Sequence, residues 1–277
     1  MAILICMRSL PYSAAAVRFG GLVAALWQSP VTLLTVVADL AAVPAAEAAM
    51  VPAGSMLASV PGRVTDITYK VRSGPVAEEI LDEATDPVYR LIVLGANLVP
   101  SLLQVWSGGV TRRVAARSPA AVLVVKPPVD DPPQLRRILI CAAGGGRDRP
   151  VVTLAADLAA PAGANVSVLH VADPIPAMYS GLTGMAESLD QLLRSDTPVA
   201  RQLRWCARYL AGRQITGDLQ LRHGPVVDEI LREAAAGDYD LVVLGSSSRA
   251  STLRRLLAQP ITQHLIENAP CSVLMAH

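Results

Sequence analysis

The sequence predicts an α/β fold made of two tandem domains, each built around an open parallel sheet. Three observations support this prediction. Short uncharged runs rich in β-branched residues, such as 241–244, are typical of strands buried on both faces of a parallel sheet. A loop and a helical segment separate this run from the next apolar run at 272–275. The same order of segments occurs twice along the chain, which indicates a duplicated domain.

The duplication is visible when the two halves are aligned. Segments 71–81 and 221–231 share a Gly-Pro turn followed by a helical pattern, and both halves continue to an apolar run that ends in Gly95 or Gly245. These two glycines are 150 positions apart, whereas the opening apolar runs are 135 apart. The second copy therefore carries 15 additional residues between its first strand and its Gly-Pro turn.

Length and composition agree with two domains. A chain of 277 residues is long enough for two separate cores. The net charge of +1 is spread without a basic face, which argues against nucleic acid as a partner. Because residues 126–134 are rich in proline, we expect a linker there. The predicted domains are therefore 1–127 and 135–277.

The cysteines and histidines predict no metal site. Cys6, Cys141, Cys206 and Cys271 lack metal-ligand spacing, and Cys6 and Cys141 occupy equivalent positions in first strands. We expect free thiols in a reducing cytoplasm. No basic segment precedes the first apolar residues, so a signal peptide is not expected.

The uncharged stretch 19–38 has the length of a membrane span, but Gln-Ser-Pro at 28–30 interrupts it. We expect a helix over 12–27 and a strand over 31–37 instead, because the matching part of the second copy contains Asp157 and other polar residues. No membrane association is therefore predicted.

The second helix is expected to differ between the copies. Residues 41–62 are rich in alanine and proline, which predicts a loop with at most a short helix. The second copy has a helical pattern over 199–212. In the third helix of each copy, acidic residues near the helix start are expected to complement the helix dipole and to be structural. These residues are Glu78, Glu79, Asp228 and Glu229.

The segment order, the Gly-Pro turn, the D-L-V-V-L-G run at 240–245 and the A-P-C-S-V-L ending resemble the universal stress protein family. The resemblance covers nearly the whole chain as two copies. It implies Rossmann-like, adenine-nucleotide-hydrolase-like domains of five strands. The last strand of each copy, 121–125 or 272–276, lies at a sheet edge in this family. Because pairing would cover both edges, we expect the two copies to pack as a pseudo-dimer.

Nucleotide-binding members of the family carry an Asp after the first strand and a G-x2-G-x9-G-[ST] motif after the fourth. The first copy has Arg8 at the Asp position and Leu98 at the second glycine of the motif. It retains Gly95 and has Gly108 and Gly109 in place of Gly-Ser. This copy is therefore predicted to be a degenerate nucleotide site.

The second copy keeps more of the pattern but also departs from it. Ala143 replaces the Asp, and Gln259-Pro260 replaces Gly-Ser, so a backbone N–H is missing at Pro260. The family places the end of the second strand, at His170 and Val171, near the adenine. We expect His170 to be a packed core residue. The candidate contacts of a weakly bound ATP are Ala143, Gly144, Gly145, Val171, Gly245, Ser246, Ser247, Ser248 and Arg249.

These departures favour a non-enzymatic stress-response protein that acts as a scaffold or regulator, with no catalytic residues. The alternative is an ATP-binding protein that uses the second domain. A remoter alternative is an adenylating enzyme, because 144–149 resembles the S-G-G-x-D-S loop of ATP pyrophosphatases, although both serines are missing. A further homo-oligomer or a protein partner is compatible with the scaffold reading.

Overall fold

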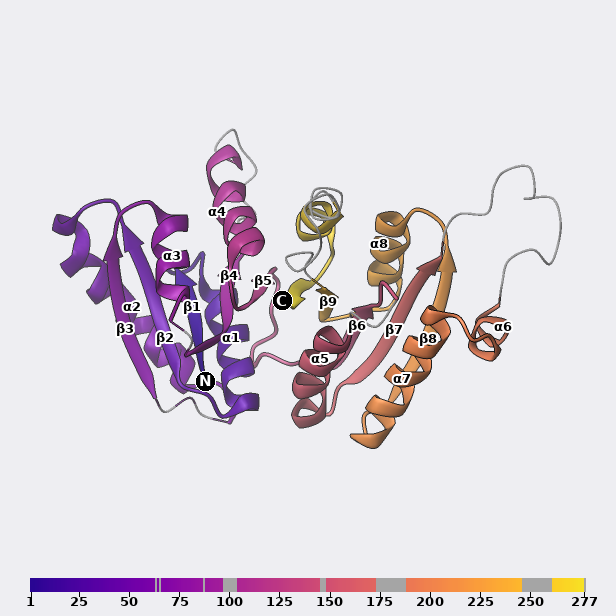
Figure 1. Ribbon diagram of the computed structural model, residues 1–277. Helices are drawn as coiled ribbons and strands as arrows, with labels where there is room; N and C mark the ends of the chain where they lie inside the picture. Colours follow the sequence, from indigo (N-terminus) through magenta and orange to yellow (C-terminus); the bar gives the residue numbers. More distant parts are fainter. Residues whose placement is uncertain are drawn as a thin grey trace. The chain divides into compact units, whose positions relative to one another are not determined.

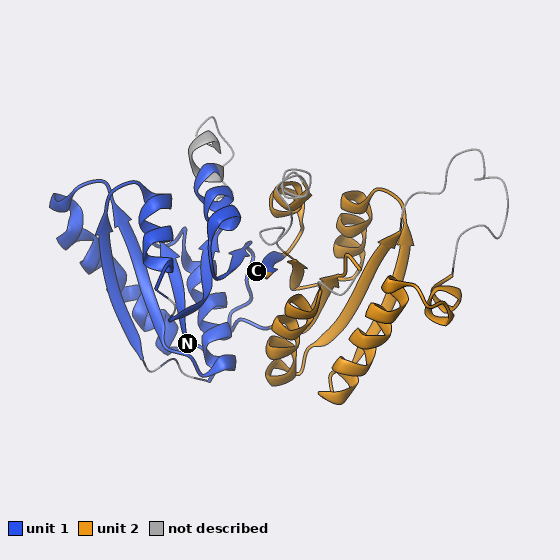
Figure 2. Cartoon of the chain, viewed as in Figure 1, with its two compact units in different colours: residues 1–134, 272–275, 277 blue, residues 135–271, 276 orange. Residues whose placement is uncertain are grey.

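The computed structural model describes residues 1–62, 64, 66–86, 88–96, 104–144, 148–172, 188–245 and 261–276 (Figure 1). The chain divides into two compact units (Figure 2). Unit 1 comprises residues 1–134 together with 272–275, and unit 2 comprises residues 135–271 and 276. The strand closest to the C-terminus is therefore largely part of the first unit.

Unit 1 is a sheet in the order β3-β2-β1-β4-β5-β10, in which β10 is antiparallel to β5 and the other strands are parallel. Helices connect the parallel strands. The elements are β1 Ala2–Met7, α1 Ala14–Trp27, β2 Val31–Val37, the 3-10 helix η1 Leu40–Ala42, α2 Val43–Ala58, β3 Ile67–Ser73, α3 Val76–Ala84, β4 Tyr89–Gly95, α4 Gln104–Arg117, β5 Ala121–Val125 and β10 Ser272–Ala276.

Unit 2 repeats this plan with the parallel strand order β9-β6-β7-β8. The elements are β6 Arg137–Cys141, α5 Arg149–Ala162, β7 Asn165–Ala172, α6 Leu189–Arg194, α7 Pro198–Gly212, β8 Gly217–His223, α8 Val226–Ala236 and β9 Leu241–Gly245. A further helix covers 261–268. The short helix α6 lies in the region where the second copy is longer.

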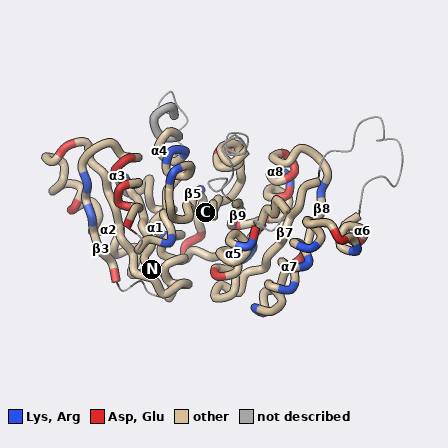
Figure 3. Tube along the Cα trace, in the orientation of Figure 1, with Lys and Arg blue, Asp and Glu red and all other residues tan. Residues whose placement is uncertain are grey.

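The middle of the central strand in each unit is apolar and completely buried. Ile3, Leu4 and Ile5 of β1 have no exposed surface, and the same is true of 138–140 in β6. In Figure 3 the charged residues lie mainly on helices and on the outer strands. No polar side chain fits within these central strands, so polar groups concentrate where the strands end.

The structure confirms the predicted α/β fold with two tandem copies. It also confirms that the uncharged stretch 19–38 is not one continuous helix, because α1 and β2 are separate elements. The pairing of the two last strands occurs as expected: β5 and β10 run antiparallel, with Val124 opposite Val273 and Val122 opposite Met275.

The predicted loop over 41–62 is wrong, because α2 is a helix of 16 residues. Pro44 lies in its first turn, where the missing N–H has no intrahelical partner in any case. Pro52 lies inside the helix, but the helix also contributes Met50, Ala53 and Leu57 to the core of unit 1, where all three are fully buried. Tertiary packing therefore outweighs the local cost of proline.

Among the described helices, the segment Leu40–Ala58 is long and apolar enough to cross a membrane by length and composition. Its mean hydropathy is 1.4, and 28% of the window is buried within the structure. A core helix of a soluble protein meets the same criteria, and this one packs Leu57 and Met50 into the core of unit 1.

The register between β5 and β10 predicts where a disulfide can form. Directly opposite residues of antiparallel strands have Cα atoms about 4.5–5.5 Å apart, within the range that a disulfide spans. We expect the double variant Val122→Cys/Met275→Cys to form a disulfide on oxidation, detected by peptide mapping with mass spectrometry. The control Val122→Cys/Leu274→Cys places the second thiol on the opposite face and should not cross-link. Equal cross-linking of both variants would contradict the register.

Candidate functional site

The carboxyl ends of β6, β7 and β9 lie at one edge of the sheet in unit 2. The parallel registers pair Ile140 with both Val168 and Val243, so these strands end at similar heights. This is the position at which open α/β sheets bind ligands. Of the predicted contacts in the second copy, the structure describes Ala143, Gly144, Val171 and Gly245. The other five, Gly145, Ser246, Ser247, Ser248 and Arg249, lie outside the described residues.

The loop after β6 is organised by a carboxylate that the prediction did not include. Asp148 directly precedes α5, and its side chain returns to the start of the loop. Its Oδ2 accepts a hydrogen bond of 2.8 Å from the Gly144 N–H, and its Oδ1 accepts one of 3.2 Å from the Ala143 N–H. The two backbone donors at this position are therefore already occupied by the protein's own anion.

The Asp148 carboxyl is only 4% exposed. Burial raises its pKa above the ordinary value of 3.8, while the hydrogen bonds from Gly144 and Ala143 and the nearby His170 act in the opposite direction. A buried carboxylate keeps its charge only when donors surround it. The two amides of the loop supply these donors.

In unit 1 the equivalent hydrogen bond, from a backbone N–H after the first strand to the side chain before the first helix, has a neutral acceptor. Ser13 is the residue before α1, and its Oγ accepts a hydrogen bond of 2.9 Å from the Arg8 N–H. Ser13 and Asp148 are 135 positions apart, as are Arg8 and Ala143, so the two contacts are equivalent. The second copy therefore has a carboxylate where the first copy has a hydroxyl. The missed signal in the sequence is an Asp immediately before a segment with Pro150 in its first turn.

His170 and Gly144 pack this loop against its neighbours. His170 is 9% exposed, and its Nδ1 lies 2.9 Å from the carbonyl oxygen of Ala142. This agrees with the predicted role as a packed core residue. Gly144 has a φ of +81°, and a Cβ at this position would lie 2.8 Å from a methyl group of Val199 in α7. Both the dihedral and the contact require glycine here.

The glycines that end β4 and β9 differ in their surroundings. A Cβ at Gly245 would lie 3.2 Å from Cγ2 of Val151, whereas a Cβ at Gly95 would lie at an ordinary 3.7 Å from Ala16. Gly245 is the exposed last residue of its strand. Of the degenerate motif in the first copy, Gly108 and Gly109 both lie within α4.

The cysteines near this edge are not activated. Burial raises the pKa of the Cys141 thiol and of its counterpart Cys6 well above the ordinary value, and raises that of Cys206 to about 11. All four cysteines are free. Thiols with raised pKa values are poor nucleophiles. Among the described residues, no group of three His, Cys, Asp or Glu side chains is arranged to hold a metal ion.

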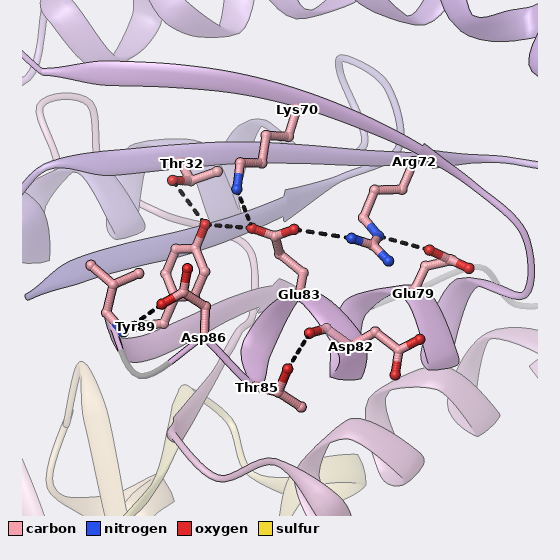
Figure 4. A network of polar contacts seen from close by, with 10 residues as sticks. Thr32, Lys70, Arg72, Glu79, Asp82, Glu83, Thr85, Asp86 and Tyr89 are labelled. Atoms are coloured by element: carbon pink, nitrogen blue, oxygen red, sulfur yellow. Dashed lines mark hydrogen bonds and ion pairs between the residues drawn. The ribbon is translucent and has the colours of Figure 1, made fainter.

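A second polar cluster lies beneath α3 in unit 1 (Figure 4). Glu83 is 7% exposed and accepts hydrogen bonds from Tyr89 Oη at 2.7 Å and from Lys70 Nζ at 2.6 Å. Arg72 of β3 bridges Glu83 and Glu79, at 3.3 and 2.7 Å. These contacts join α3 to β3 and to the start of β4.

Unit 2 repeats the cluster at positions 150 residues later. Tyr239 Oη donates to Glu233 at 3.0 Å, and Arg222 pairs with Glu233 and, at 3.8 Å, with Glu229. Gln220 occupies the position of Lys70. Glu79 and Glu229 are thus structural, as predicted, but through arginine pairs from the preceding strand in addition to their place in the first helical turn. The prediction missed Glu83 and Glu233.

Comparisons with known proteins agree with this architecture. The family model described as the universal stress protein family matches residues 1–126 and 134–277. A universal stress protein from Archaeoglobus fulgidus DSM 4304 has 16% identity and a TM-score of 0.71, covering 99% of this chain and 95% of its own. A functionally unknown protein from Pseudomonas aeruginosa PAO1 has 18% identity and a TM-score of 0.67, with 99% and 92% covered. No curated protein matches the chain.

The Asp148 contacts predict a graded response to substitution. Hydrogen bonds to a charged group contribute about 1.5–3 kcal/mol, and tenfold in an equilibrium corresponds to about 1.4 kcal/mol. In Asp148→Ala we therefore expect hydrogen exchange at the amides of Ala143 and Gly144 to become at least about tenfold faster. Asp148→Ser, which copies unit 1, should keep part of the protection. Unchanged exchange in Asp148→Ala would show that these bonds do not hold the loop.

The Glu83 cluster predicts an acid dependence of stability. Burial raises the pKa of Glu83, but Lys70, Tyr89 and Arg72 outweigh it, so the net pKa lies below the ordinary 4.5. A lowered pKa contributes stability above the unfolded value that is lost as pH falls through the folded value. Glu83→Gln should therefore destabilise unit 1 by about 1–3 kcal/mol at pH 7, and the difference from wild type should shrink below about pH 4.5.

Urea unfolding at several pH values measures this difference. Asp82→Asn, on the exposed side of the same helix, is the control and should follow the wild-type pH profile. A difference between wild type and Glu83→Gln that stays constant from pH 7 to about pH 3 would contradict the assigned role of the charge.

Proposed function

Because the chain belongs to the universal stress protein family and contains two copies of its domain, we propose that it is a non-enzymatic stress-response protein that acts as a scaffold or regulator. Its nucleotide sites are degenerate in this proposal, and binding to other proteins is the principal activity. The free cysteines are in keeping with a reducing cytoplasm as its place of action.

The observation that carries the proposal is the position of Asp148. A phosphate group that binds in a strand-to-helix loop of an α/β fold needs backbone N–H groups that are free to donate to it. In unit 2 the carboxylate of Asp148 takes the N–H groups of Ala143 and Gly144. A second anion at this point would lose those donors and would meet a buried negative charge. The loop after β6 therefore disfavours a nucleotide phosphate.

The sequence beyond the described residues adds to this argument. Gln259-Pro260 stands where nucleotide-binding relatives have Gly-Ser, so both a hydroxyl and a backbone N–H are missing. Ala143 has no carboxylate to contact a nucleoside. Each lost contact weakens binding by about 1–3 kcal/mol, which together moves a micromolar site toward the millimolar range.

Weak ATP binding by unit 2 is the second candidate, and Gly245 favours it. This glycine is exposed at the carboxyl end of β9, and three serines and Arg249 follow it in the sequence. Unit 1 has Leu98 and Arg8 at the corresponding motif positions. Helix α2 is full-length, so the second helices do not distinguish the two units, and the preference for unit 2 depends on these residue differences.

A thermal-shift titration with Mg-ATP distinguishes these functions. We expect wild type to respond only at millimolar ATP, Gly245→Val to lose the response, and Gly95→Val to keep it, since ligand stabilisation scales with concentration over Kd. Asp148→Ser should strengthen the response by freeing the amide of Gly144.

A micromolar response in wild type would overturn the degenerate-site proposal, and a response abolished by Gly95→Val would assign the site to unit 1. Release of phosphate or pyrophosphate from ATP by the wild-type chain would overturn the non-enzymatic assignment. Circular dichroism of each variant checks that the fold is retained.

A further inference from the structure

The second helices of the two units, α2 and α7, hold equivalent places but differ on their solvent faces. Each packs beside the outer strand of its unit, β3 or β8. Their buried residues align with the same spacing of three and four positions. The aligned pairs are Met50 with Leu203, Ala53 with Cys206, and Leu57 with Leu210.

In this alignment, three arginines of α7 correspond to uncharged residues of α2. Arg201, Arg204 and Arg208 correspond to Ala48, Val51 and Ser55. Blue segments in Figure 3 mark basic residues along α7. Helix α2 contains a single charged residue, Glu47, within its 16 positions. The buried faces of the two helices share one spacing of apolar residues. Their exposed faces differ, because that of α7 carries arginines and that of α2 is almost free of charge.

The exposed face of α2 is an apolar surface. Val51 is 62% exposed on the helix, and Leu40 just before it is 75% exposed. Tyr69 of β3 is 48% exposed, and its hydroxyl lies against Gly54, where a Cβ would be only 1.9 Å away. We call Leu40, Ala48, Val51, Pro52 and Tyr69 the α2 surface. Exposed apolar residues on a helix and on the strand beside it are typical of an interaction site.

The charge pattern of α2 suits a second copy of the same chain. In a twofold interface a residue on the axis meets its own copy, so a charged residue there meets a like charge. Helix α2 has no charged residue near its centre, so a twofold pair of α2 helices avoids this repulsion. A twofold pair of α7 helices would bring arginines close to one another. In an antiparallel pair of α2 helices, Val51 lies at the middle of Val43–Ala58 and faces its own copy. Glu47 then faces the hydroxyl of Ser55 in the other copy.

A lipid surface fits α2 less well. Helices that lie on membranes carry Lys or Arg on their polar face to meet anionic lipids. Helix α2 has Glu47 and no basic residue. It also buries Met50, Ala53 and Leu57 completely in the core of unit 1, so these side chains are not available to lipid.

We propose that the α2 surface is the interface through which two copies of this chain associate about a twofold axis near Val51. The partner is a second copy, and the contact is apolar at its centre, with Glu47 and Ser55 paired at each side. The association does not depend on nucleotide binding, so it stands or falls separately from the degenerate-site proposal.

Analytical ultracentrifugation of the full chain over a range of concentrations tests this interface. Wild type should reach twice the chain mass, while Val51→Arg and Val51→Glu should each remain at the single-chain mass because like charges meet at the axis. An equimolar mixture of the two variants should return to the doubled mass, since Arg then faces Glu. This recovery also shows that both variants are folded.

The matched control is Arg208→Glu, which changes a charge on the exposed face of α7 and should leave the wild-type mass unchanged. The proposal is overturned if wild type stays at the single-chain mass at every concentration, if either Val51 variant still doubles, or if the mixture does not recover. Wild type that stays single but binds phosphatidylcholine vesicles through α2 would assign the surface to lipid and also overturn it.

Discussion

The complete burial of the central strands is the constraint on which the rest of each unit depends. The middle residues of β1 and β6 lie between parallel neighbours and are fully buried, whereas Arg137 at the start of β6 is exposed. A charged side chain on these two strands is therefore tolerated only at a strand end. Asp148 lies at the carboxyl edge of unit 2, and Glu83 lies with Thr32 and Tyr89 near the amino ends of β2 and β4.

The fold was predictable because its signals are local and repeated. Short continuous apolar runs typical of buried strands alternate with helical patterns. They occur in the same order twice, so each copy supports the assignment of the other. Helix α2 was not predicted because, when helix propensity is judged from the segment alone, its two prolines count more against a helix than its alanines count for one. Its stability comes from Met50 and Leu57 in the core, which depends on the position of β3 and is not visible within the segment.

The site was less predictable because its contacts join residues that sequence patterns treat separately. Asp148 contacts amides four and five residues earlier, and Arg72 reaches Glu79 and Glu83 from a different element. Comparison of the copies resolves part of this: the family's acid is missing at Ala143, yet a carboxylate enters the same loop from Asp148. The missing acid at Ala143 and the carboxylate of Asp148 belong to the same strand-to-helix connection, but the Asp148 carboxylate accepts hydrogen bonds from the backbone of this connection.

The membership of β10 in unit 1 has a consequence for synthesis. Residues 1–134 leave the ribosome well before 272–275, so for most of translation the uncovered side of β5 presents an apolar strand with unpaired backbone groups. Such an edge recruits other strands if it stays open. The first unit therefore keeps this open edge until residues 272–275 have been made. A chain truncated before residue 272 would keep the edge for good, so its first unit would be prone to aggregate although every residue before the linker is intact.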